Sequence, residues 1–318
     1  MQLTMHTYQT EDDYWRIRAF LREVFLLNGR RELCWPVARL DYWRWHGIEN
    51  CKRCAPMDQV MFLWETGDGQ IAAVLNPEGQ GEAHLQVHPT WRTPELEEEM
   101  IAVAEQRLAC VRSDGQRTLV VFVDGRDTSR HAILIRRGYA KRGWPEHQWR
   151  RELDLPIPDV AVAPGYTVRS LGNVDELPAR SWASWRAFHP DEPNEHYEGW
   201  EWYHNIQRMP LYRRDLDLVA VAPTGEITSF CTIWYDDVTR SAYYEPVGTM
   251  PEHQRRGLAK AVLTEGLRRL KRMGATRAFV GGYEPGPNAL YTSAMGTEHD
   301  LSEPWTKEWP SPQDPVDK

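Results

Sequence analysis

The clearest hydrophobic pattern lies in the last third of the chain, where apolar residues recur at intervals of three and four positions. The residues with this spacing are Ala259, Val262, Leu263, Gly266, Leu267, Leu270 and Met273. This period predicts an amphipathic helix over 257–273 with one face packed on a sheet. The residues before it, 243–250, indicate a strand, and a short basic turn joins the two segments.

The same order of elements occurs twice in the chain. Each half has two strands around a turn, then a strand, a helix, a further strand and a final short segment. The segments are 60–65, 70–75, 83–92, 94–112, 118–123 and 132–139 in the first half, and 218–222, 227–234, 243–254, 257–273, 277–281 and 289–296 in the second. This order predicts two tandem α/β domains with one plan.

A proline-rich stretch separates the two halves and predicts an extended linker. We therefore expect an N-terminal domain over 1–153, a linker over 154–165 and a C-terminal domain over 166–318.

With 318 residues, 41% hydrophobic and 26% charged, the chain has the composition of a folded globular protein. Its net charge of −8 argues against a nucleic-acid-binding surface. No apolar stretch approaches the ~20 residues of a membrane span, and the N-terminus lacks the pattern of a secretory signal. We expect a cytoplasmic monomer or homodimer that binds neither nucleic acid nor membrane.

The cysteines are few and odd in number, which makes a disulfide framework improbable. Cys51 and Cys54 have the spacing of zinc ligands and His46 lies close by, but no second Cys-x-x-Cys pair completes a tetrahedral site. We expect no metal.

The turn before the C-terminal helix has the chemistry of an anion site. A helix that begins after a tight turn leaves several backbone N–H groups without partners, and the helix dipole makes its N-terminus positive. Gly257 has no side chain to obstruct a ligand, and Arg255 and Arg256 add positive charge. These features predict a cradle for pyrophosphate; the alternative is a surface turn with two solvated arginines.

The order Gln254-Arg255-Arg256-Gly257-Leu258-Ala259 resembles the acetyl-CoA-binding signature of the GNAT N-acetyltransferase superfamily. A second segment, Pro287 to Tyr291 followed by Gly296, is similar to another motif of that family, with shorter spacing. Two departures are Ala259, where glycine is commoner, and Thr297, where phenylalanine is usual.

The resemblance implies two GNAT domains, each a mixed, mostly antiparallel sheet flanked by helices, with acetyl-CoA as cosubstrate. The cofactor-binding residues that it implies are Val247, Gly248, Thr249, Met250, Gln254, Arg255, Arg256, Gly257, Leu258, Ala259 and Asn288. Pro246 interrupts the preceding strand and marks the expected bulge where strands of this family separate to admit the cofactor.

Two residues are candidates for proton transfer. Tyr291 matches the family tyrosine that protonates the departing thiolate, although a core tyrosine on a short helix is the alternative. Glu245 is the candidate base that removes the proton of the amine; an exposed strand glutamate or a cation-anchoring residue is the alternative. Asn288 could orient the cofactor or cap the helix before Ala289.

The N-terminal half lacks the corresponding groups. Arg92-Thr93-Pro94-Glu95 contains no glycine and begins an acidic helix, and Ile135 occupies the position that matches Tyr291. We expect this domain to be a degenerate copy that does not bind acetyl-CoA, a layout that resembles mycothiol synthase.

The segment 188–204 is rich in acids, aromatic residues and histidines, which suits a cationic amine; a solvated loop is the alternative. The resemblance thus implies an N-acetyltransferase that transfers the acetyl group to a small-molecule primary amine by direct attack in a ternary complex. The alternatives are a non-catalytic acyl-CoA-binding or regulatory module, and a transferase with another acyl or aminoacyl donor.

Overall fold

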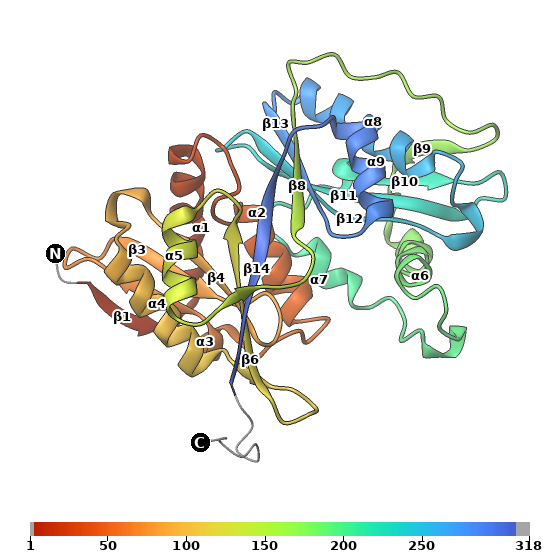
Figure 1. The fold of residues 1–318 in the computed structure, drawn as a ribbon. Helices are drawn as coiled ribbons and strands as arrows, with labels where there is room; N and C mark the ends of the chain where they lie inside the picture. The colour runs from red at the N-terminus through yellow and green to blue at the C-terminus, as the bar shows by residue number, and fades with distance from the viewer. Residues whose placement is uncertain (1–2, 310–318) are drawn as a thin grey trace. The chain divides into compact units, whose positions relative to one another are not determined.

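The computed structural model describes residues 3–309 (Figure 1). Its internal contacts divide the chain into two compact units, each with its own hydrophobic core. We call residues up to 147 together with those from 300 onward the N-terminal unit, and residues 148–299 the C-terminal unit. None of the helices in the described range combines the length and the hydrophobicity of a membrane span.

The N-terminal unit is built on a sheet with the strand order β1-β2-β3-β4-β6-β14. Its strands are β1 (Thr4–Thr7), β2 (Phe62–Glu65), β3 (Ile71–Asn76), β4 (Glu82–Val87), β6 (Arg117–Asp124) and β14 (His299–Trp309), with short β5 (Cys110–Val111) and β7 (Ala140–Lys141) beside them. Its helices are α1 (Glu11–Leu27), α2 (Val37–Tyr42), α3 (Met57–Val60), α4 (Pro94–Arg107) and α5 (Thr128–Arg136), with a π-helical turn at Trp43–Ile48. Only β4 and β6 pair in parallel along this order of described strands; the other pairs are antiparallel.

The C-terminal unit repeats this plan, with the strand order β8-β13-β12-β11-β10-β9. Its strands are β8 (Glu146–Glu152), β9 (Thr167–Ser170), β10 (Asp217–Val221), β11 (Ile227–Asp236), β12 (Ser241–Thr249) and β13 (Arg277–Gly282). Its helices are α6 (Leu177–Phe188), α7 (Tyr203–Gln207), α8 (Leu258–Arg272) and α9 (Pro285–Met295). Within it, β12 and β13 are parallel. The expected fold class, a mixed and mostly antiparallel sheet with flanking helices, is confirmed.

The last strand of the chain does not belong to the unit that precedes it. From Asp300 onward β14 lies in the N-terminal unit, where it pairs with β6. Residues of β8 from Gln148 onward lie in the C-terminal unit, and Trp149 is part of its core. These divisions differ from the boundaries at 153 and 166 that the sequence suggested. Periodicity identifies strands but contains no information on which sheet each strand joins.

The helix expected over 257–273 is α8, which begins at Leu258 and packs on β11 and β12. Its apolar face includes Gly266, where a β-carbon would collide with Ile233 and lie 2.9 Å from the Tyr244 hydroxyl. Glycine is needed here because the helix lies directly against the sheet. This close contact fixes the distance between α8 and the sheet. It therefore also positions the turn at the N-terminus of α8.

We expect replacement of Trp305 by alanine to destabilise the N-terminal unit. This β14 side chain is 9% exposed, belongs to the N-terminal core and stacks on His131 at a ring distance of 4.9 Å. Truncation of a buried tryptophan costs about 3–5 kcal/mol. Denaturant unfolding should show this loss, and hydrogen exchange should accelerate in β6.

Trp144→Ala is the matched control, since Trp144 is 78% exposed in the same unit. Faster exchange in β10–β12 instead of β6 would contradict the assignment of β14.

Candidate active site

The turn between β12 and α8 has two consecutive features of a ligand-binding loop. A short 3₁₀ turn, Pro251–His253, follows β12, and α8 then begins after Gly257. Arg255 and Gly257 both have left-handed backbones, with φ of 62° and 75°. A β-carbon on Gly257 would meet no atom within 4 Å, so the space beside this residue is open. The loop therefore presents its backbone to an unobstructed surface.

The backbone N–H groups from Arg255 to Lys260 form no hydrogen bond with residues 3–309. No side chain caps the N-terminus of α8. Successive unbonded amides around left-handed residues form a concave anion site, which the positive end of the helix dipole strengthens. The amides of Gly257, Leu258 and Ala259 thus have the geometry of an anion site, and their contact with a pyrophosphate stays a prediction.

The side chains of the loop agree with this arrangement. Arg255 and Arg256 are exposed and form no ion pair within the described range. The Arg256 guanidinium lies 3.4 Å from the Glu252 carbonyl oxygen, and the Gln254 amide donates to the Thr249 carbonyl over 3.3 Å. Leu258 is buried in the core, so it contributes only its backbone.

The strand before the loop separates from its parallel neighbour. Pairing of β12 with β13 covers only residues 241–243 and ends at Tyr243 opposite Phe279, whereas β12 continues to Thr249 along β11. Beyond Tyr243 the β13-facing edge of β12 has no strand partner among the described residues. An unpaired edge of this kind can accept an extended ligand as an added strand.

A bulge accompanies the separation. The register between β11 and β12 shifts so that Glu245 and Pro246 both lie opposite Thr232. The expected bulge at Pro246 is confirmed. Bulges bend a strand and redirect its side chains, so the bulge sets where the Glu245 carboxylate leaves β12.

The residues after the bulge have different surroundings. Val247 packs against the core. Gly248 has no room for a β-carbon, which would collide with Phe230 and lie 3.0 Å from Ala187. The Thr249 hydroxyl lies 2.8 Å from that of Ser229, and the Met250 amide donates to the Thr228 carbonyl over 2.9 Å. Residues 247–250 would therefore contact a ligand mainly through their backbone groups, because their side chains pack within the protein.

Tyr291 lies on α9, which follows β13, and is 7% exposed. Burial raises the pKa of its hydroxyl, and the nearby Cys231 thiol and Glu245 carboxylate raise it further. The charge of one predicted proton-transfer residue, Glu245, thus acts on the hydroxyl of the other, Tyr291. Cys231, a buried residue of β11 to which no sequence motif drew attention, also acts electrostatically on this hydroxyl.

The Tyr291 hydroxyl forms no hydrogen bond with residues 3–309. Gly282, at the end of β13, lets α9 approach: a β-carbon there would lie 3.0 Å from the Tyr291 ring and 2.6 Å from the Asn288 amide oxygen. The tyrosine is therefore positioned by backbone packing, and its proton remains available.

Asn288 is not a helix cap, and that alternative was wrong. Helix α9 begins at Pro285, with Glu284 as its N-cap residue. Asn288 therefore lies within the helix. The Asn288 side chain accepts a hydrogen bond from the Trp149 indole over 2.9 Å and lies 3.3 Å from the Tyr283 carbonyl. It ties β8 to α9, and its contact with a cofactor stays a prediction.

The N-terminal unit satisfies the equivalent helix start with its own atoms. Thr93 caps α4 by accepting from the Leu96 amide over 3.2 Å, and Pro94 has no N–H to offer. Arg92 is paired with Glu97 at 2.8 Å and with Asp127 at 2.5 Å. These contacts leave no cradle for a phosphate.

The separating strands of the N-terminal unit are also filled. β4 and β6 pair only at Glu82 and Ala83, and immediately beyond them His84 stacks on Phe122 at a ring distance of 4.9 Å. The stack occupies the position at which an extended ligand would enter. A degenerate first copy therefore agrees with the geometry at both the helix start and the strands.

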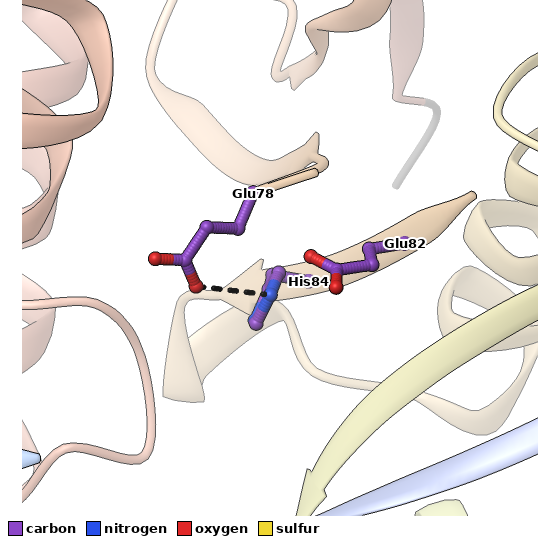
Figure 2. A group of neighbouring side chains, drawn as sticks. All are labelled: Glu78, Glu82 and His84. Carbon is purple, nitrogen blue, oxygen red and sulfur yellow. Dashed lines mark ion pairs between the residues drawn. The ribbon is translucent and has the colours of Figure 1, made fainter. Parts of the chain in front are cut away.

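Figure 2 shows Glu78, Glu82 and His84, whose oxygen and nitrogen atoms lie within 4.8 Å of one another; this is the one such group of metal-ligand types among residues 3–309. The Trp35 indole donates to His84 Nδ1 over 3.2 Å, so the neutral ring carries its hydrogen on Nε2. Burial, and secondarily the charge of Arg39, lower the pKa of His84 to about 3.

The polarity of this cluster is unfavourable for a cation. His84 Nε2 points a hydrogen, not a lone pair, toward the carboxylates, and Arg39 lies 2.5 Å from Glu78 and already neutralises it. The Cys51 thiol lies 3.4 Å from His46, but Cys54 does not join them in a metal-type group.

The acidic and aromatic segment 188–204 begins where α6 ends. Trp182 and Trp185 stack at 5.5 Å, and Tyr197 meets Trp182 edge-on at 5.2 Å. His189 is held by the Trp185 carbonyl at 3.0 Å and His196 lies 3.5 Å from Glu192, so neither approaches Glu245 through a described contact.

A cavity of about 300 Å³ lies beside these rings. Its walls include Trp182 and Arg186 from α6, Asn194 from the segment, and Glu226, Met250, Glu252 and His253. The cavity therefore extends from the aromatic side chains of α6 to the turn at 250–253, which precedes the predicted cradle.

Part of the chain is similar to a known protein family. The model of the Acetyltransferase (GNAT) family matches residues 176–296. No curated protein sequence matches the chain.

Solved structures match over nearly the whole chain. A GCN5-related N-acetyltransferase from Sphaerobacter thermophilus is 20% identical, with a TM-score of 0.65, over 96% of this chain and 95% of that one. A tandem GNAT protein from the clavulanic acid biosynthesis pathway is 16% identical, with a TM-score of 0.66, over 98% and 100%. A GNAT-family acetyltransferase from Colwellia psychrerythraea is 12% identical, with a TM-score of 0.60, over 96% and 100%. These likenesses extend the tandem fold to both units.

We expect Gly257→Val to lower the affinity for acetyl-CoA at least 10-fold. A β-carbon would enter the open space beside the free amides, and each charge-assisted hydrogen bond lost costs about 1.5–3 kcal/mol. Calorimetric titration measures the change. Gly69→Val is the matched control, because Gly69 also has a left-handed backbone (φ 81°) and open space, in a hairpin of the other unit. Equal affinity of the Gly257 variant and the wild type would place the cradle elsewhere.

We also expect one acetyl-CoA per chain, bound by the C-terminal unit. The capped start of α4 and the His84–Phe122 stack leave the N-terminal unit without a phosphate site or an open strand edge. Calorimetric titration of the full chain should give a stoichiometry near one, and a second saturable site would contradict this.

Proposed function

We propose that the chain is an acetyl-CoA-dependent N-acetyltransferase acting on the primary amine of a small molecule, starting from the match of residues 176–296 to the acetyltransferase (GNAT) family model. The family supports acyl transfer from an acyl-CoA in general; the acetyl group and the amine are the finer proposal.

The observation that carries the proposal is the position of Glu245 and Tyr291 at one separation between strands. Glu245 stands at the bulge of β12 and Tyr291 on the helix that follows β13, and the carboxylate is close enough to raise the pKa of the phenol. The cradle at Gly257 lies at the end of the same strand. A cofactor held by the cradle and laid along the β12 edge would bring its thioester between a base and an acid.

In this arrangement Glu245 accepts a proton from the substrate ammonium, directly or through water. The free amine attacks the thioester carbonyl, forming the carbon–nitrogen bond, and the carbonyl oxygen takes the negative charge. Backbone N–H groups of β12 between Val247 and Thr249 are the donors that we propose to stabilise that oxyanion. Collapse of the tetrahedral adduct breaks the carbon–sulfur bond, Tyr291 protonates the leaving thiolate, and the nitrogen of the new amide loses its remaining extra proton to solvent.

A cationic acceptor fits the surface beside α6. Asp191, Glu192, Glu195 and Glu198 are exposed, and the half-buried Trp182, Trp185 and Tyr197 offer aromatic faces for a cation. A primary amine is charged near neutral pH, so this surface supports an ammonium substrate.

The test is release of CoA by the purified full chain from acetyl-CoA and a panel of amines, including amino acids, polyamines and aminoglycosides. We expect at least one amine to raise the release of thiol well above its rate without acceptor. Tight binding of acetyl-CoA with no release for any amine would favour a binding module instead. Faster turnover with a longer acyl or aminoacyl donor would correct the donor.

We expect Tyr291→Phe to lower kcat by roughly 10²–10⁴-fold with little change in affinity for acetyl-CoA, because only the proton donor is lost. The raised pKa keeps the phenol protonated beyond its ordinary value of 10. The wild-type rate should therefore show no decline from this group between pH 7 and 10, in steady-state assays across that range.

Tyr139→Phe is the control for this substitution. Tyr139 is a buried tyrosine of the N-terminal unit whose hydroxyl also lacks a hydrogen-bond partner within residues 3–309. Near-wild-type kcat for both variants would show that Tyr291 is only a core residue.

A further inference from the structure

A buried tryptophan is bonded to the backbone of β12 where that strand bulges. Trp234, on β11, donates its indole Nε1–H to the carbonyl oxygen of Glu245 over 2.6 Å. Its side chain is fully buried. The sequence analysis predicted Trp234 only as part of the strand over 227–234.

The bulge explains why the carbonyl takes a side-chain donor. Glu245 and Pro246 together oppose Thr232, so the regular ladder between β11 and β12 is interrupted at this point. Pro246 has no N–H, and the peptide group between the two residues therefore has the Glu245 carbonyl as its only polar group. Since partly buried carbonyls need a donor, the indole supplies the one that the ladder lacks.

Trp234 packs beside a buried group of hydrogen-bonded polar side chains. Its ring lies 6.2 Å from that of Tyr212, whose hydroxyl donates to Asp217 over 3.1 Å. Tyr203 donates to the same carboxylate over 2.6 Å, and Asp217 is completely buried. The indole thus packs beside a ring that is itself hydrogen-bonded to a buried carboxylate.

The residue opposite the bulge belongs to the same network. Thr232 donates to Asp217 over 3.3 Å and accepts from the Arg180 guanidinium over 3.2 Å. Arg180 comes from α6, is completely buried and lies 3.8 Å above the Phe230 ring. The bulge is thus fixed on β11 from both Thr232 and Trp234.

We propose that Trp234 is the positioning residue for the base of the transfer reaction. Its N–H fixes the plane of the peptide group after Glu245 and, through it, the direction in which the Glu245 side chain leaves the strand. This inference rests on the proposed function, which assigns the base role to Glu245. Rotation of that peptide displaces the carboxylate, and a displacement of about 1 Å can cost roughly 10² in rate.

The first test is Trp234→Phe, which removes the donor and retains an aromatic ring. We expect kcat to fall about 10–100-fold while the KM for acetyl-CoA changes less than about two-fold, because the cradle is untouched. The matched control is Trp43→Phe in the N-terminal unit, where a 2% exposed tryptophan donates to the Glu78 carbonyl over 3.1 Å. It loses an equivalent hydrogen bond and should keep its activity.

A double-mutant cycle with Glu245→Gln separates positioning from general destabilisation. If Trp234 acts through Glu245, then adding Trp234→Phe to Glu245→Gln should lower kcat less than about two-fold further. Losses that multiply in full would overturn the inference.

The crystal structure of the Trp234→Phe variant gives a readout that does not depend on turnover. We expect the Glu245 peptide group to be rotated or the carboxylate to occupy several positions. An unchanged peptide plane and carboxylate would overturn the inference. If the phenylalanine variant does not fold, 3-benzothienylalanine at position 234 keeps the bicyclic shape without the N–H and serves for the same measurements.

If the wild-type chain releases no CoA with any amine, the proposed function fails. The structural readout still decides whether Trp234 holds the bulge.

Discussion

Beyond Tyr243, β12 no longer pairs with β13, and the backbone groups on that edge need partners from outside the sheet. This separation orders the whole candidate site. It opens the edge along which an extended ligand can pair, places Glu245 at its beginning and leads the chain into the loop of unbonded amides before α8. Tyr291 reaches the same point from the other side, because α9 follows the strand that β12 leaves.

Both units contain a pair of parallel strands that separates after two or three residues, but the space beyond the paired residues differs between them. In the N-terminal unit the stack of His84 on Phe122 follows the last paired residues, and Thr93 and Pro94 complete the start of α4. In the C-terminal unit the equivalent amides have no partner among residues 3–309. The first arrangement satisfies its polar groups within the unit. The second leaves amides open to solvent or to the phosphate ligand that we predict.

Precise positions at the site come from close packing as much as from hydrogen bonds. Gly266 lets α8 lie against the sheet, Gly248 accommodates Phe230, and Gly282 admits Asn288 and Tyr291. A side chain at any of the three would displace a neighbouring element. The indole of Trp234 adds a directional contact to the bulge itself.

Much of this architecture follows from the sequence alone. The apolar period determined α8, the repeated order of elements determined two units with one plan, and Gly257 with its two arginines indicated the anion cradle. Pro246 correctly marked the bulge, because a proline cannot donate to a ladder wherever it stands. These features depend on local spacing or on the chemistry of one residue, which a linear pattern contains.

Other features were decided only by tertiary structure. The membership of β14 in the N-terminal unit and of most of β8 in the C-terminal unit depends on pairing between strands far apart in the chain, which periodicity does not specify. The role of Asn288 was misread as a possible cap because its partner, Trp149, comes from a distant strand. The effect of Cys231 on the pKa of Tyr291 and the hydrogen bond from Trp234 to Glu245 likewise arise when separate strands and helices pack together. The sequence determined which chemical groups exist and on which elements they lie, and the fold determined which of them meet.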